Sequence, residues 1–96
     1  MSKPIKDIQL YNDLSAVEEL LLADGWTQGT EFDPVTGSRC LLGAVTHVLY
    51  KQESPERYSA VCETLGPAAA VAAFNDAPTT TLEDVLARLR AARDAL

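Results

Sequence analysis

The sequence has few of the residues from which metal sites and nucleophilic sites are built. It contains one histidine, His47, and two cysteines, Cys40 and Cys62, among 96 residues. Structural zinc sites usually take two ligands from positions close together in sequence, and no such pair is present. Two cysteines also cannot make the disulfide framework of a small secreted domain. We therefore expect no metal site, and reduced thiols as in a cytoplasmic protein.

Basic residues are also scarce. Eight lysines and arginines stand against fourteen aspartates and glutamates, which gives a formal net charge of −6. Nucleic acids and anionic membranes bind through basic groups that displace counterions, so we expect neither as a partner. The acidic charge suits a partner with a basic surface, although solubility alone explains it equally well.

Long apolar runs and cofactor motifs are missing as well. The run Leu20–Ala23 is too short, and its flanks are too acidic, for a signal peptide or a membrane span. The sequence has no phosphate loop, dinucleotide fingerprint or paired-carboxylate signature, so we expect no cofactor. With 47% apolar residues it can build one core. We expect a single helical domain over residues 1–96, with residues 1–10 flexible.

Apolar residues recur at helical spacing through most of the chain. The sequence predicts helices over about Asp13–Ala23, Cys40–Lys51, Pro55–Leu65, Pro67–Phe74 and Leu82–Leu96. The segment Trp26–Arg39 combines β-forming residues with the turn Asp33–Gly37, which predicts a small hairpin or an ordered loop. The predicted fold class is all-α, with four to five short helices around one core and this segment between the first two.

Polar residues are expected to cap these helices or to face water. Asn12 or Asp13 would begin the first helix, and Glu18 and Glu19 would be solvated. Ser54 would cap the third helix ahead of a proline in its first turn.

The last helix has the clearest pattern. Thr81, or Thr80 together with Glu83, would make a capping arrangement. Arg88 would pair locally with Glu83 or Asp84, one turn earlier. The arginines of this helix are expected on a solvated face: Arg88, Arg90 and Arg93. Its leucines could alternatively form the seam of a homodimer, although the stretch is too short for a sustained coiled coil.

Four short motifs together resemble a small family of uncharacterised proteins, a domain of unknown function, from actinobacteria and their bacteriophages. The motifs are GWTQG at Gly25–Gly29, CLLGA at Cys40–Ala44, NDAP at Asn75–Pro78 and TLEDVL at Thr81–Leu86. The resemblance covers about Leu14 to Leu89. It implies one compact domain and an actinobacterial or phage source, with the host cytoplasm as its location in the phage case. It implies no reaction.

One candidate catalytic site involves Cys40, His47 and Asp76. Cys40 lies at the expected start of a helix, where the helix dipole lowers the pKa of a thiol. A thiol nucleophile needs a base within hydrogen-bond reach, but seven residues in a continuous helix separate Cys40 from His47 by about 10 Å. We therefore favour a small buried thiol without a catalytic role, and keep the site as an alternative.

A second candidate site would bind a partner through Trp26, Gln28, Asn75 and Asp76. Asn75 and Asp76 are expected to join two helices, where such residues bond nearby backbone amides. Asp76 could instead orient a ligand or an arginine of a partner. Trp26 could belong to the core or anchor an interface, since tryptophan is enriched in binding hot spots.

Two function hypotheses follow from these residues. The first is a non-enzymatic interaction or regulatory module that binds an unidentified protein partner. In a phage, that partner would be a host factor. The second is a small enzyme or ligand-binding protein with a pocket around Cys40, His47, Asn75 and Asp76. The second requires the helix after Cys40 to be broken, or a partner subunit to complete the site.

Overall fold

Five helices make up the computed structural model, which describes residues 5–50 and 53–96. They are α1 (Ile5–Asp24), α2 (Leu41–Leu49), α3 (Pro55–Leu65), α4 (Ala68–Asp76) and α5 (Leu82–Asp94). The described residues form no strand, and the segment between α1 and α2 is a loop with two isolated bridges. The predicted all-α fold is confirmed, and the segment takes the form of an ordered loop.

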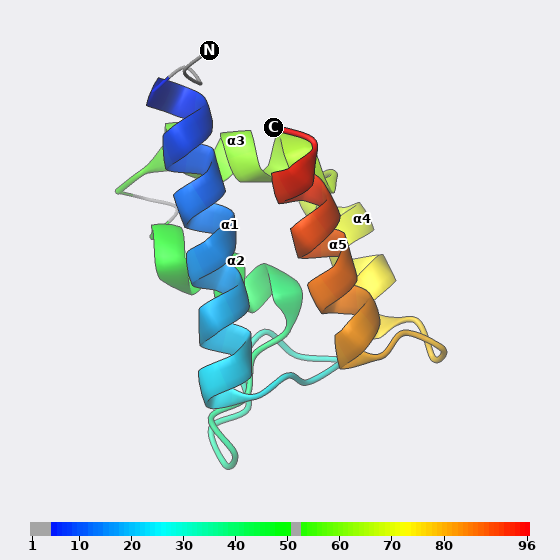
Figure 1. Cartoon of the computed structure of the whole chain (residues 1–96). Helices are drawn as coiled ribbons and strands as arrows, with labels where there is room; N and C mark the ends of the chain where they lie inside the picture. The colour runs from blue at the N-terminus through cyan, green and yellow to red at the C-terminus, as the bar shows by residue number, and fades with distance from the viewer. Residues whose placement is uncertain (1–4, 51–52) are drawn as a thin grey trace.

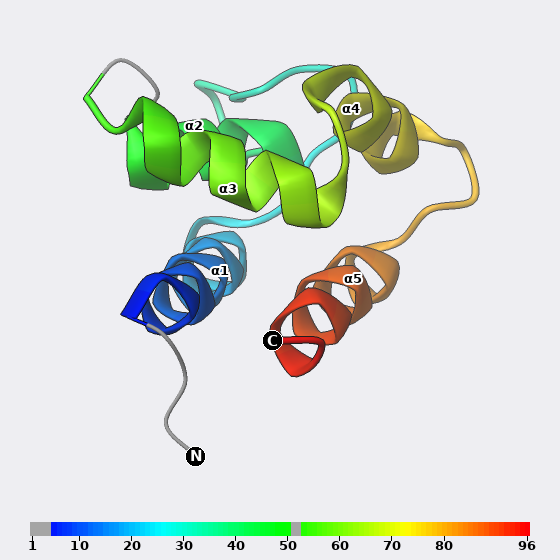
Figure 2. The same cartoon turned by 90° about the horizontal axis from the view of Figure 1, so that it is seen from above.

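The helices form two layers. α1 and α5 run in opposite directions in one layer, and the other three helices lie behind them (Figure 1). The view from above separates the two layers clearly (Figure 2). α1 contacts α2, α3 and α5, while α2 also contacts α3 and α4. In the described part of the chain, no helix combines the length and the apolar character that a membrane span requires.

The core between the layers is aliphatic and takes side chains from all five helices. Spacing of three and four residues places these side chains on one face of each helix. Burial of one such side chain contributes roughly 1.5–3 kcal/mol to the free energy of unfolding. The core cluster consists of Leu14, Val17, Leu21, Leu41, Ala44, Val45, Leu49, Val61, Leu65, Val71, Val85 and Leu89.

The predicted starts of α3 and α5 are confirmed. α3 begins at Pro55, with Ser54 at the N-cap position, although the Ser54 side chain makes no capping hydrogen bond. α5 begins after Thr81, whose hydroxyl accepts a hydrogen bond from the backbone N–H of Asp84. The Asp84 carboxylate accepts one from the Thr81 N–H, so Asp84 and not the predicted Glu83 completes the cap.

Other boundaries differ from the prediction. α2 begins at Leu41, because Cys40 is its N-cap residue. The predicted end of this helix at Lys51 lies outside the described residues. α4 begins at Ala68 and extends to Asp76. Asn75 and Asp76 therefore belong to the last turn of a helix, and the prediction that they lie between two helices is wrong.

The predicted start of α1 is also wrong. Asp13 does not cap the helix but lies in its interior, because α1 already begins at Ile5. The Asp13 carboxylate is buried and accepts two hydrogen bonds from the Arg57 guanidinium of α3, at 2.6 and 3.1 Å. Of the end predicted to be flexible, residues 5–10 belong to α1, and residues 1–4 lie outside the described residues.

The prediction that Glu18 faces water is wrong too. Its side chain is buried and its two carboxylate oxygens accept hydrogen bonds from Arg90 and Arg93 of α5, at 2.7 and 2.6 Å. Glu19, the next residue, is exposed as predicted. Glu18 therefore joins the two helices of one layer through a charged contact.

Arg88 does not pair with the acidic residues one turn earlier. Its guanidinium donates a hydrogen bond of 2.9 Å to the carbonyl oxygen of Leu65 and lies 4.6 Å from the centre of the Phe74 ring. Leu65 is the last residue of α3, where carbonyl oxygens lack helical partners. Arg88 thus connects α5 to both α3 and α4.

We expect Glu18→Gln to lower the free energy of unfolding by about 1–2 kcal/mol, because it leaves the partly buried Arg93 without its counter-charge. Urea unfolding followed by circular dichroism measures this change. The matched control is Glu19→Gln, which removes an exposed charge from the neighbouring position and should change stability by less than about 0.5 kcal/mol. Equal effects of the two substitutions would contradict the assigned role of Glu18.

Candidate functional site

The side-chain amide of Asn75 connects three segments of the chain. Its oxygen accepts hydrogen bonds from the Trp26 indole N–H at 2.6 Å and from the backbone N–H of Leu41 at 2.9 Å. Its nitrogen donates to the carbonyl oxygen of Thr27 at 3.1 Å and to the Asp76 carboxylate at 2.9 Å. All four hydrogen-bonding positions of this fully buried amide are therefore used.

We call this set of hydrogen bonds the Asn75 junction. Gln28 and Asp76 add further hydrogen bonds to it. Gln28 donates hydrogen bonds to the carbonyl oxygens of Asn75 and Ala77, at 2.9 and 3.0 Å. The Asp76 carboxylate accepts the backbone N–H of Gly29 at 2.9 Å. This bond and the amide of Asn75 lower the pKa of Asp76. The carboxylate is therefore ionised at neutral pH.

The structure thus brings together all four residues of the predicted partner-binding site. Their polar groups, however, bond to one another and to the backbone of the loop. The Trp26 side chain is half-buried and packs against the core. The role that the contacts support for Trp26, Gln28, Asn75 and Asp76 is to hold the loop between α1 and α2 against α4. Partner binding through their own side chains stays a prediction.

We expect Asn75→Ala to lower the free energy of unfolding by about 1–3 kcal/mol, because buried donors of Trp26 and Leu41 lose their acceptor. Asn12→Ala, at an exposed position of α1, is the control and should be nearly neutral. Urea unfolding of both variants provides the measurement. A neutral Asn75→Ala would show that water replaces the amide without cost.

Cys40 has a structural position at the start of α2. Its sulfur accepts a hydrogen bond of 3.2 Å from the backbone N–H of Gly43, as an N-cap residue does. Burial raises the pKa of the Cys40 thiol, and the hydrogen bond from Gly43 offsets only part of that effect. The helix start therefore does not activate this thiol in the way the sequence suggested.

His47 lies apart from Cys40. α2 is continuous from Leu41 to Leu49, so the rise between the two residues remains about 10 Å. The exposed His47 ring lies 6.0 Å from the ring of Tyr50, centre to centre. Within the part of the chain that the structure describes, no three His, Cys, Asp or Glu side chains are grouped as metal ligands.

We expect the Cys40 thiol to react with iodoacetamide more slowly than free cysteine near neutral pH, because it is buried and its pKa is raised. The measurement is mass spectrometry on a Cys62→Ser variant, in which Cys40 is the remaining cysteine. In denaturing urea the rate should rise to that of the free amino acid. Faster reaction in the folded protein would revive the catalytic alternative.

The loop between α1 and α2 is fixed closely against α2. The backbone N–H of Cys40 donates to the carbonyl oxygen of Glu31 at 3.3 Å. A side chain on Gly43 would overlap this same carbonyl group, so glycine permits the approach. At the tip, the Asp33 carboxylate accepts the backbone N–H groups of Val35 and Thr36, at 2.9 and 3.4 Å.

Exposed apolar groups lie on this loop and at the end of α2. Phe32 is 44% exposed, Val35 at the tip is 91% exposed, and Tyr50 at the end of α2 is 55% exposed. We call these three residues and the hollow beside Phe32 the loop face. The hollow has a volume of about 310 Å³ and is lined by Glu31, Phe32, Arg39, Gly43, Thr46, His47 and Tyr50.

Phe32, Val35 and Tyr50 were not among the site residues predicted from the sequence, whereas His47, which lines the hollow, was. The available signal was the turn Asp33–Gly37, which has apolar residues on it and beside it where polar residues are usual. Arg39 also belongs to this region. Its guanidinium lies 4.7 Å from the centre of the Phe32 ring and pairs with Asp24 at 2.8 Å.

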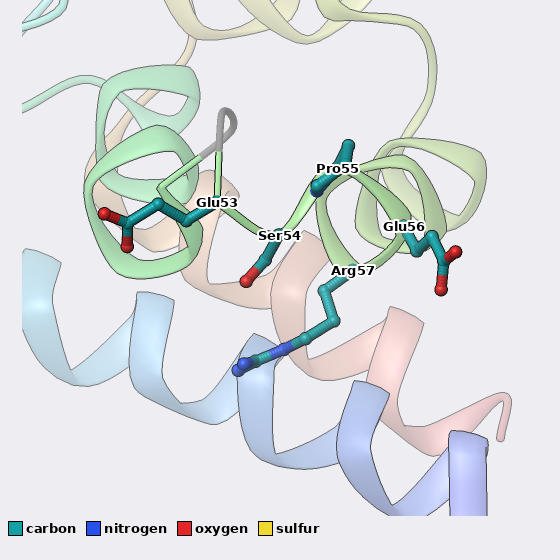
Figure 3. A pocket seen from close by; sticks show the side chains of 5 residues that line it. All are labelled: Glu53, Ser54, Pro55, Glu56 and Arg57. Atoms are coloured by element: carbon teal, nitrogen blue, oxygen red, sulfur yellow. The ribbon is translucent and has the colours of Figure 1, made fainter.

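A further hollow at the start of α3 has a volume of about 340 Å³ but no converging polar groups. It is lined by Glu53, Ser54, Pro55, Glu56 and Arg57. Figure 3 shows that Glu53 and Glu56 point in different directions, while Arg57 extends toward α1. Arg57 is already paired with Asp13 there. We therefore place the candidate site on the loop face.

A family model described as a family of unknown function (DUF6197) matches residues 6–95 of the chain. No curated protein and no solved structure matches it.

Proposed function

The chain belongs to this family of unknown function, and we propose that it is a non-enzymatic protein-interaction module that binds a protein partner through the loop face. The partner has a basic surface, and the binding occurs in the cytoplasm. The resemblance to proteins of actinobacteria and their phages extends the proposal, because the partner of a phage-encoded module would be a host factor.

The observation that carries this proposal is the exposure of Phe32 and Val35 on a firmly held loop, together with that of Tyr50 at the end of α2. Single exposed apolar residues are common on protein surfaces. Here, however, two aromatic side chains border the same hollow, and Val35 projects from the tip of the loop that carries one of them. Aromatic residues are enriched in the few positions that dominate binding energies.

The way the loop is held supports a binding role. The Asn75 junction fixes the start of the loop, and the contact between Gly43 and Glu31 fixes its later part. A loop that is already ordered loses little conformational entropy when a partner binds, so more of the contact energy appears as affinity. The loop face is therefore suited to binding without rearrangement.

The distribution of charge supports a basic partner. Each of the five arginines, all of which are described, has a partner within the protein: Arg39, Arg57, Arg88, Arg90 and Arg93. Four of them pair with carboxylates, Arg88 bonds a carbonyl oxygen, and the formal net charge of the chain is −6. A basic partner surface would be attracted at long range, and its association would slow as salt is added.

The test is a photo-crosslinking experiment in actinobacterial lysate. A photoreactive amino acid replaces Val35 in one variant of the chain and Ile8 in a second variant. Ile8 is also exposed, at 47%, but lies in the first turn of α1, whereas the loop follows the last residue of this helix. We expect one partner protein of the lysate to crosslink to the variant with the label at position 35 and not to the variant with the label at position 8.

Purified partner then provides the decisive measurement. We expect Phe32→Ala together with Val35→Asp to weaken binding at least roughly tenfold, since truncation of a hot-spot residue costs about 2 kcal/mol or more. Ile8→Ser should leave the affinity unchanged. The proposal fails if both variants bind equally well, or if the loop face captures only a second copy of this chain.

A further inference from the structure

We infer that the hollow of the loop face is a slot for one lysine or arginine side chain of the partner, an inference that rests on the proposed function and specifies its chemistry. The hollow is about 310 Å³, at the low end of the range of about 300–1,000 Å³ for small-molecule sites. A space of this size suits a single long side chain.

The groups around the hollow match a cation. Glu31 is exposed and lines the hollow, and its negative charge also acts on the Cys40 thiol and on Tyr58. Phe32, His47 and Tyr50 line the hollow with aromatic rings. A carboxylate combined with aromatic rings is the arrangement by which proteins bind ammonium and guanidinium groups.

Arg39 is a cation that already lies over one of these rings, Phe32. Its guanidinium lies 4.7 Å from the centre of the Phe32 ring, and its charge is balanced by Asp24 at 2.8 Å. The Glu31 carboxylate is not used in this pair. A second cation that pairs with Glu31 would therefore not face an unbalanced positive charge of Arg39.

The backbone at Tyr50 provides an independent observation. Tyr50 ends α2 with φ 45° and ψ 79°, in the left-handed region that glycine or asparagine usually occupies after a helix. In the described residues it is the one position other than glycine with a positive φ. Yet this position carries a large ring that is 55% exposed, so the fold gains little from it. Strain of this kind is characteristic of functional positions.

The Tyr50 conformation allows a test that separates an effect on binding from an effect on stability. Tyr50→Gly places the favoured residue at a left-handed position, so the fold should keep its stability while the slot loses one ring. Tyr50→Phe retains the ring. Glu31→Gln removes the charge and keeps the shape, and Glu19→Gln is its control, because Glu19 is exposed on α1.

The probes are Nα-acetyl-lysine amide, which keeps the charged side-chain ammonium, and the uncharged Nα-acetyl-norleucine amide. Each is titrated into the full chain, and binding is followed by NMR. We expect the lysine probe to shift the amide resonances of Glu31, Thr46 and Tyr50, and the norleucine probe to leave them in place. Glu31→Gln and Tyr50→Gly should each lower the affinity for the lysine probe roughly tenfold. Tyr50→Phe and Glu19→Gln should bind this probe as tightly as the natural protein does. Equal shifts with both probes, or full binding by Glu31→Gln, would overturn the inference.

The outcome separates this inference from the proposed function. If Glu31→Gln binds the crosslinked partner as tightly as the natural protein, while the Phe32→Ala and Val35→Asp variant does not, the loop face binds a partner without using the slot. If no partner is captured at position 35 but the lysine probe still binds, the slot exists and the proposed function is wrong.

Discussion

One buried amide determines how the loop and two helices of this protein meet. Asn75 lies at the end of α4, yet its bonds reach the start of the loop and the first residue of α2. A buried amide tolerates no unpaired position, since each unmet donor or acceptor costs about 1–3 kcal/mol. Separating α4 from the loop or from α2 therefore breaks hydrogen bonds of this one amide. The position of the loop face depends on these bonds.

The second constraint is the use of arginine between helices. Asp13 and Glu18 are buried carboxylates on α1, and each is paired with arginine from a helix distant in sequence. Such pairs need good geometry to offset the loss of hydration, so they favour one arrangement of the helices over others. In these pairs the carboxylates are the buried partners, while Arg57 and Arg90 stay about half exposed at the surface.

Much of the architecture could be predicted from the sequence. Helical spacing predicted α2, α3 and α5 closely, and proline and threonine marked the starts of α3 and α5, because these signals act within a few neighbouring residues. The errors at Asp13, Glu18 and Asn75 share one cause. A polar residue that caps a helix locally and one that pairs across the core look the same in sequence, because the partner lies 44 residues or more away for Asp13 and Glu18.

The candidate site was only partly predictable, for a related reason. Trp26, Gln28, Asn75 and Asp76 were grouped into one site from the sequence, and they are neighbours in the structure. Their hydrogen bonds turn inward, however, which no local pattern reveals. Conversely, Tyr50 looks in sequence like an ordinary helix residue, and only its backbone conformation distinguishes it.

Trp26 gives the protein an optical reporter of its own loop. It is the single tryptophan of the chain, and its indole N–H lies within the Asn75 junction. Its fluorescence emission therefore depends on whether the loop is docked, whereas circular dichroism reports the helices. A shift in emission without a loss of helical signal would reveal a state in which the loop has detached while the two helical layers remain intact.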